Sequence, residues 1–151
     1  MRDIQTMFNA VGGQGPITAT ARSTNSIDLA DLLHNLGQTS QKIMLKVKCN
    51  VSFNNLTSLT IELDSAPDNS TWTSTMIVGT AVVLANLIAG NMLFIVDLGD
   101  YGKIQSPLPS AGYFEGMPPG PNPLQRYISM NYTVTGSAPT TGTIDSWLDV
   151  F

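Results

Sequence analysis

Two stretches of alternating apolar and polar residues in the first half of the chain predict β-strands. Between Met44 and Val51, the apolar side chains Leu45, Val47, Cys49 and Val51 alternate with two lysines. The run from Leu59 to Leu63 repeats this pattern, which is typical of a strand with one buried face. Asn54 and Asn55 lie between the two runs and suit the positive φ of a tight turn. We therefore expect the two strands to form a hairpin.

The C-terminal part of the chain shows the same alternation twice more. Apolar residues alternate with small polar ones from Tyr127 to Thr135, and Gly136-Ser137 leads into a second alternating run from Thr143 to Val150. These runs predict a second hairpin. In its last strand, Trp147 shares a face with two aspartates and is expected on the wetter side unless something covers it.

The rest of the pattern adds strands and very little helix. The apolar run over residues 91–98 predicts a strand buried on both faces, and shorter strands are expected within 18–24, 27–29 and 73–80. Residues 28–37 and 83–90 each show a weak, short helical spacing. Strands separated by turn-rich loops, without strand–helix alternation, predict an all-β fold, an antiparallel β-sandwich or a jelly roll.

Two segments differ in character from the predicted strands. Residues 1–16 place a few apolar side chains ahead of a glycine-rich stretch, so we expect an N-terminal arm followed by one domain over 17–151. Within that domain, residues 99–126 combine six prolines with glycines and aromatic residues. A loop of this length is usually functional or disordered, and both readings stay open.

Composition narrows the class of protein. The chain has 151 residues, enough for one domain, and only 12% of them are charged, with a net charge of −4. Lys42, Lys46 and Lys48 are the only cluster of basic residues, which argues against nucleic-acid binding. One cysteine, Cys49, cannot form an intrachain disulfide. We expect no signal peptide and no membrane span, and synthesis in a cytoplasm.

The sequence offers little for catalysis or metal binding. His34 is the single histidine, so metal sites that need two histidines or paired cysteines are excluded. Asp64, Asp68 and Asn69 could hold calcium, but a turn between strands is the favoured interpretation. We expect no cofactor, no metal and no enzymatic activity. A hydrolase would depend on His34 or on a pair of carboxylates.

Several motifs, taken in order along the chain, resemble the small capsid cement, or decoration, proteins of tailed bacteriophages. They are Met1–Thr6 with Phe8, Ile17–Ala21, Ser23–Leu29, Leu56–Asp64, Ala85–Gly90 and Arg126–Gly136. This resemblance implies a β-sandwich or jelly-roll subunit that forms trimers on the outer surface of the phage head and clamps major capsid subunits together. Residues 99–126 depart from it, being longer and richer in proline and glycine.

The resemblance leads to a set of candidate contact residues. We predict that Ile4, Met7 and Phe8 anchor the arm on the capsid, with Arg2 and Asp3 pairing with capsid charges. A second set is expected to make trimer or loop contacts: Tyr113, Phe114 and Trp147. The expected partners are the major capsid protein and further copies of this chain, with no nucleic acid and no membrane. The alternative is a carbohydrate- or receptor-binding β-sandwich of a virion, for which the tryptophans and tyrosines could form a stacking platform.

Overall fold

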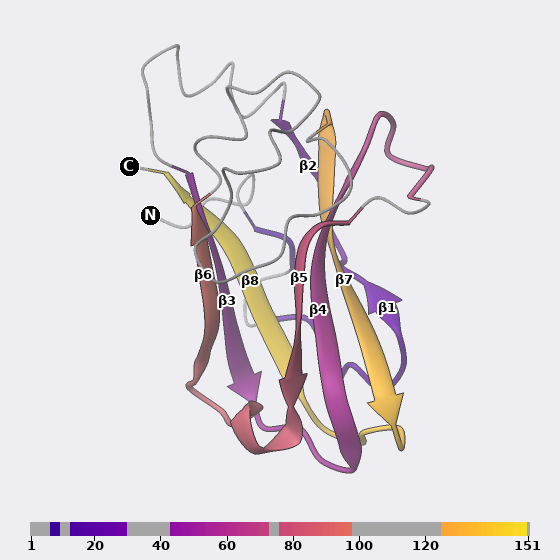
Figure 1. Cartoon of the computed structure of the whole chain (residues 1–151), viewed down its shortest axis with the longest axis vertical. Coiled ribbons are helices and arrows are strands. Elements are labelled where there is room, and N and C mark those ends of the chain that lie inside the picture. The colour runs from indigo at the N-terminus through magenta and orange to yellow at the C-terminus, as the bar shows by residue number, and fades with distance from the viewer. Residues whose placement is uncertain (1–6, 10–12, 30–42, 73–75, 98–124, 151) are drawn as a thin grey trace.

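The computed structural model shows two antiparallel sheets packed face to face as a sandwich (Figure 1). It describes residues 7–9, 13–29, 43–72, 76–97 and 125–150. One sheet has the strand order β1-β7-β4-β5, with β2 also paired to β7, and the other has the order β6-β3-β8. The strands are β1 (Ala21–Arg22), β2 (Ile27–Asp28), β3 (Ile43–Val51), β4 (Leu56–Ala66), β5 (Met76–Val83), β6 (Met92–Asp97), β7 (Tyr127–Gly136) and β8 (Thr143–Val150). The predicted all-β sandwich is confirmed.

The alternation in the sequence sets which side chains lie between the sheets. On β3, Leu45, Val47 and Cys49 are fully buried, while Lys46 and Lys48 between them are partly exposed. The other long strands repeat this pattern with the following buried residues: Leu59, Ile61 and Leu63 on β4, Ile128, Met130 and Tyr132 on β7, and Ile144 and Leu148 on β8. One continuous core therefore joins the two sheets.

Both predicted hairpins are wrong. β3 pairs with β6 and β8 but not with β4, and β7 and β8 lie in different sheets. Asn55 does have the expected positive φ of 64°. The chain nevertheless uses this position to cross from one sheet to the other. Along the chain, β3 is followed by β4 and β7 by β8. The antiparallel pair β3–β8 in one sheet is therefore connected at both strands to the antiparallel pair β4–β7 in the other sheet, which is a jelly-roll-like connection.

The β3–β4 connection and the β7–β8 connection, which both cross between the sheets, are hydrogen-bonded to each other. Asn54 Oδ1 accepts hydrogen bonds from the backbone N–H groups of Thr140 (2.8 Å) and Thr141 (3.2 Å). Gly142 has a φ of +130°, and a Cβ at this position would lie 2.3 Å from the Phe53 ring. A glycine is therefore needed at position 142, where the β7–β8 connection passes close to the Phe53 ring of the β3–β4 connection.

Strand β6 differs from its prediction as a strand buried on both faces. It is an edge strand, and Met92 and Ile95 are exposed on it, while Val96 is buried. The residues expected to make two helical turns, 83–90, contain one 3-10 turn, η2 (Leu84–Asn86). The other weak helical pattern, over 28–37, lies outside the described residues after position 29. In the described ranges, no helix has the length and apolar character to span a membrane.

Candidate functional site

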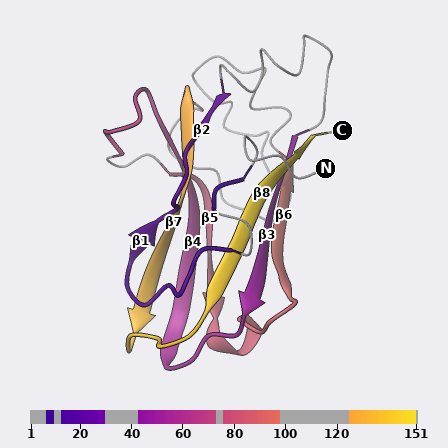
Figure 2. The same cartoon turned by 180° about the vertical axis from the view of Figure 1, so that it is seen from behind.

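The N-terminal segment, residues 7–9 and 13–16, lies along the edge of β8 that faces away from β3 (Figure 2). Phe8 N–H donates to the Ser146 carbonyl (3.1 Å), and Gln14 exchanges two backbone hydrogen bonds with Ile144 (2.7 and 3.1 Å). The same segment then continues to β1 and β2, which pair with β7 in the other sheet. It therefore closes one side of the sandwich.

This placement corrects the prediction for two of the arm residues. Met7 is 5% exposed and Phe8 is 0% exposed, and Phe8 belongs to the hydrophobic core. Residues 7–9 and 13–16 are part of the sandwich and not of a free arm, because the backbone of Phe8 and Gln14 pairs with β8 and the side chains of Met7 and Phe8 are buried. Arg2, Asp3 and Ile4 lie outside the described residues.

A chain of buried hydrogen bonds fixes this segment. Tyr132 on β7 bonds to Ser146 on β8 (O···O 2.8 Å), Ser146 Oγ donates to Asn9 Oδ1 (3.0 Å), and Asn9 Nδ2 donates to the Ile144 carbonyl (3.1 Å). Burial raises the pKa of the Tyr132 hydroxyl, so the phenol stays neutral. Asn9, Tyr132 and Ser146 are all buried, and their hydrogen bonds connect the N-terminal segment to one strand of each sheet.

Trp147 is also placed differently from its prediction. Its side chain is 4% exposed within a single chain, and its Nε1 donates to Asp149 Oδ1 (3.0 Å). Lys46 lies opposite Trp147 in the sheet and pairs with Asp149 (2.5 Å). Burial alone would raise the pKa of Asp149, but its hydrogen bonds and the Lys46 charge lower it overall. Trp147 is thus not an exposed contact, and the other two candidates, Tyr113 and Phe114, lie outside the described residues.

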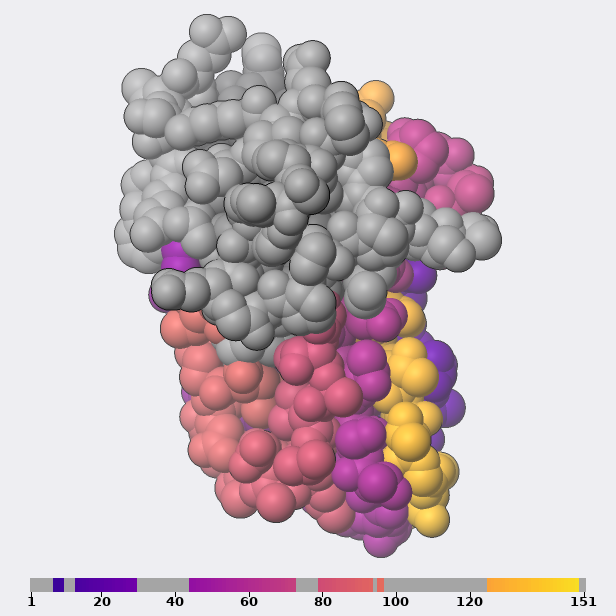
Figure 3. Space-filling view, viewed as in Figure 1, coloured from indigo at the N-terminus to yellow at the C-terminus, as the bar shows by residue number. Residues whose placement is uncertain are grey.

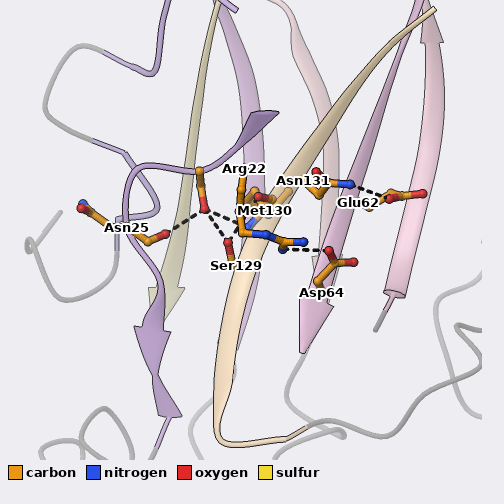
Figure 4. A network of polar contacts seen from close by, with 8 residues as sticks. Arg22, Asn25, Glu62, Asp64, Ser129, Met130 and Asn131 are labelled. Carbon is orange, nitrogen blue, oxygen red and sulfur yellow. Dashed lines mark hydrogen bonds and ion pairs between the residues drawn. The ribbon is translucent and has the colours of Figure 1, made fainter. Parts of the chain in front are cut away.

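A second polar network, which sequence reasoning missed, covers part of the larger sheet (Figure 4). Arg22 on β1 pairs with Asp64 on β4 (2.8 Å), and its guanidinium lies 4.7 Å from the centre of the Trp72 ring. Burial raises the pKa of Asp64, an effect that Arg22 opposes and the nearby Glu62 carboxylate reinforces. On β7, Asn131 Nδ2 donates to Glu62 Oε2 (3.1 Å). These contacts attach β1 and the residues after β4 to the sheet.

The acidic residues considered for calcium serve other purposes. Asp64 is paired with Arg22, and Asp68 Oδ1 accepts hydrogen bonds from Ser70 N (2.8 Å), Ser70 Oγ (2.8 Å) and Thr71 N (2.6 Å). These bonds to Ser70 and Thr71 lower the pKa of Asp68, and the geometry is that of a turn. Among the described residues, no three His, Cys, Asp or Glu side chains are grouped to hold a metal ion.

The side of the sandwich opposite the N-terminal segment has a different surface, which we call the β5–β6 side. It comprises β5, the connection over 84–91, and β6, which lie next to one another in Figure 3. From Asn69 to Val96 the sequence contains no charged residue. A groove of about 370 Å³ lies between the two strands, lined by residues 80–82, Asn86 and residues 91–93.

Large apolar side chains are exposed on the β5–β6 side and next to it. The exposed large apolar side chains of the described residues are Val51 (47%), Val83 (53%), Ile88 (51%), Met92 (44%) and Ile95 (51%). Val51 ends β3 beside the connection, where Phe53 N–H donates to the Leu87 carbonyl and Gly90 N–H to the Cys49 carbonyl. Four of these five residues belong to the β5–β6 side: Val83, Ile88, Met92 and Ile95.

These features define a small jelly-roll-like sandwich with one side closed by its own N-terminal segment and an apolar, uncharged side opposite. The chain belongs to the Bbp16 family, whose model matches residues 12–148. No curated protein matches the chain.

Proposed function

We propose that this chain is a capsid cement protein of a tailed phage, which binds the outer surface of the head as a trimer and stabilises contacts between major capsid subunits. The sequence motifs from Met1 to Gly136 support the class of protein by resemblance. The structural observation that supports it is the β5–β6 side, where an uncharged surface with exposed apolar residues suits contact with other protein subunits.

Such a function is structural and needs no chemical step. Each chain adds contacts between neighbouring capsid subunits, and a trimer makes every contact three times, so modest individual contacts sum to tight attachment. The partners are the major capsid protein and two further copies of this chain, with no nucleic acid, membrane, metal or cofactor. The protein is made in the host cytoplasm and resides on the virion surface.

Head binding tests this function directly. Purified protein is mixed with expanded heads that lack it and with unexpanded heads, and the bound fraction is measured after sedimentation. The proposal expects saturable binding to expanded heads and higher resistance of those heads to heat. Binding to isolated glycans or receptors, without binding to heads, would instead establish the alternative of a carbohydrate- or receptor-binding module.

The first residues of the chain remain proposed capsid contacts. A variant with alanine at Arg2, Asp3 and Ile4 keeps the buried residues Met7 and Phe8 in place. We expect it to unfold at the wild-type denaturant concentration but to bind heads more weakly. Equal head binding by this variant and the wild type would remove these three residues from the interface.

A further inference from the structure

The edge of β8 that faces away from β3 is occupied by the N-terminal segment and by Ile17, which follows it (Figure 2). The backbone is hydrogen-bonded there at three positions, Phe8, Gln14 and Ile17. On its other edge, β8 pairs with β3 along its whole length. Proteins that recognise an extended peptide at a sheet edge use such backbone bonds together with pockets for individual side chains. The edge of β8 therefore has the form of a peptide-binding site that this chain fills with its own residues.

Three side chains of the bound residues give this site its specificity. Phe8 is 0% exposed and Ile17 is 2% exposed, and both belong to the hydrophobic core between the sheets. Gln14 adds polar contacts, because its Nε2 donates to the Arg22 carbonyl (2.8 Å) and its Oε1 accepts from Thr24 N–H (2.9 Å). A ligand of this edge is thus an extended peptide with an apolar residue at each end and an amide side chain between them.

The sandwich keeps its central polar contact when these residues leave the edge. The hydroxyl groups of Tyr132 and Ser146 stay bonded to each other (O···O 2.8 Å), and the carbonyls of Ile144 and Ser146 turn from the segment to water. Opening is expensive mainly where it leaves a buried polar group unpaired. The principal cost here is therefore the exposure of apolar side chains, above all the ring of Phe8.

A short exposed stretch connects these residues to the larger sheet. Thr18, Ala19 and Thr20 are exposed, and β1 begins at the next residue. Thr20 Oγ1 accepts a hydrogen bond from Val134 N–H (3.2 Å). Rotations in a few loop residues are enough to redirect a segment, so residues 18–20 form a hinge that leaves the pairing of β1 with β7 intact.

We propose that the edge of β8 accepts the N-terminal segment of a neighbouring copy in place of its own. An exchange of identical segments makes the same contacts in both forms, so it costs little free energy and is favoured by a high local concentration of the chain. The proposed trimer supplies that concentration, and the inference rests on the proposed function for this setting. In the exchanged form, each sandwich is completed by the backbone and the Phe8 ring of its neighbour.

A synthetic peptide tests the acceptor site on the full chain. Phe8→Ala empties the Phe8 pocket of the chain, and a labelled peptide with the sequence of residues 7–17 offers the ring from outside. We expect saturable binding by fluorescence anisotropy and a rise of the urea midpoint toward that of the wild type. The matched control is the same peptide with Phe8→Ala, which should bind more weakly on the order of 100-fold or more.

Equal binding of the two peptides, or no binding by a folded Phe8→Ala chain, would overturn the inference. Circular dichroism shows whether the chain is folded. If Phe8→Ala is unfolded alone, the Phe8→Leu chain takes its place in the same assay, with the same two results deciding the outcome.

Shortening the hinge tests the exchange between copies. Deleting Thr18 and Ala19 removes about 7 Å of reach, which strains the seating of the N-terminal segment on its own β8. We expect this variant to form larger assemblies by size exclusion with light scattering than a control with two glycines inserted after Thr18. An excess of the peptide of residues 7–17 should return its mass to that of the control. A folded deletion variant with the mass of the control, or assemblies that the peptide leaves unchanged, would contradict the exchange.

The head-binding assay keeps this inference separate from the proposed function. Peptide binding and exchange in a protein that never binds heads would support the acceptor site and contradict the cement function. Head binding by a protein whose Phe8→Ala chain ignores the peptide would support the function and contradict the acceptor site.

Discussion

Replacing Phe8 with alanine tests whether the N-terminal segment belongs to the core. The Phe8 ring is fully buried, and its backbone joins the two halves of the fold, because Phe8 N–H donates to Ser146 while its carbonyl accepts from Asn25 N–H (2.9 Å). The backbone is held at both points, so the site cannot close easily over the lost ring. Phe→Ala changes in such positions destabilise proteins by about 3–5 kcal/mol.

The effect is large enough to measure by urea denaturation. With an m-value of about 2 kcal/mol/M, a loss of about 3–5 kcal/mol lowers the midpoint by roughly 1.5–2.5 M. The melting temperature falls by about 2–4 °C for each kcal/mol in a chain of this size. Wild type and variant are compared at one protein concentration, because self-association also stabilises the folded state.

A milder substitution serves as the control. Phe8→Leu keeps most of the apolar volume, so we expect it to cost less than about 1.5 kcal/mol. If Phe8→Ala unfolds at the same urea concentration as the wild type, the ring contributes nothing to the core. Such a result would contradict the burial of Phe8 and return residues 7–9 to the predicted arm.

Three further predictions concern buried and paired groups. Tyr132→Phe removes the bond to Ser146 and should lower the free energy of unfolding by about 1 kcal/mol, measured by denaturation; an unchanged midpoint would show that the bond contributes no stability. Lys46→Met should cost less than about 1 kcal/mol at pH 7. The pKa of Asp149 in the folded state lies below its ordinary value of 3.8, so the stabilisation from the Lys46–Asp149 pair is present above pH 3.8 and is lost as the pH falls through the lowered pKa. If the variant and the wild type differ in free energy of unfolding by the same amount at pH 7 and at pH 2, the pairing is contradicted. Burial raises the pKa of the Cys49 thiol to about 11, so a thiol reagent at pH 8 should modify Cys49 only as fast as the protein unfolds, and immediate modification of the folded chain would contradict its burial.

The sequence predicted strands and buried faces well, because both depend on local alternation. Leu45, Val47 and Cys49 on β3, and Ile144 and Leu148 on β8, lie in the core as the pattern indicates. The strand pairings were predicted wrongly. Alternation specifies a buried face but not the sheet to which it belongs, and the positive φ expected near Asn55 serves a crossing between sheets as well as a hairpin.

The candidate contacts were harder to predict for a related reason. Phe8 precedes a glycine-rich stretch that is typical of flexible segments, and only the long-range pairing with β8 buries it. Trp147 follows the alternation of β8, but the outer face of that strand is covered as well. The absence of charge from Asn69 to Val96 is a signal in the sequence, and it becomes meaningful once β5 and β6 are known to be edge strands.

A cryo-electron microscopy reconstruction of expanded heads saturated with this protein tests the central claim most directly. The account predicts added density on the outer surface of the head in groups of three sandwiches, placed over contacts between neighbouring major capsid subunits. Heads without added density, or added density that is not grouped in threes, would contradict it.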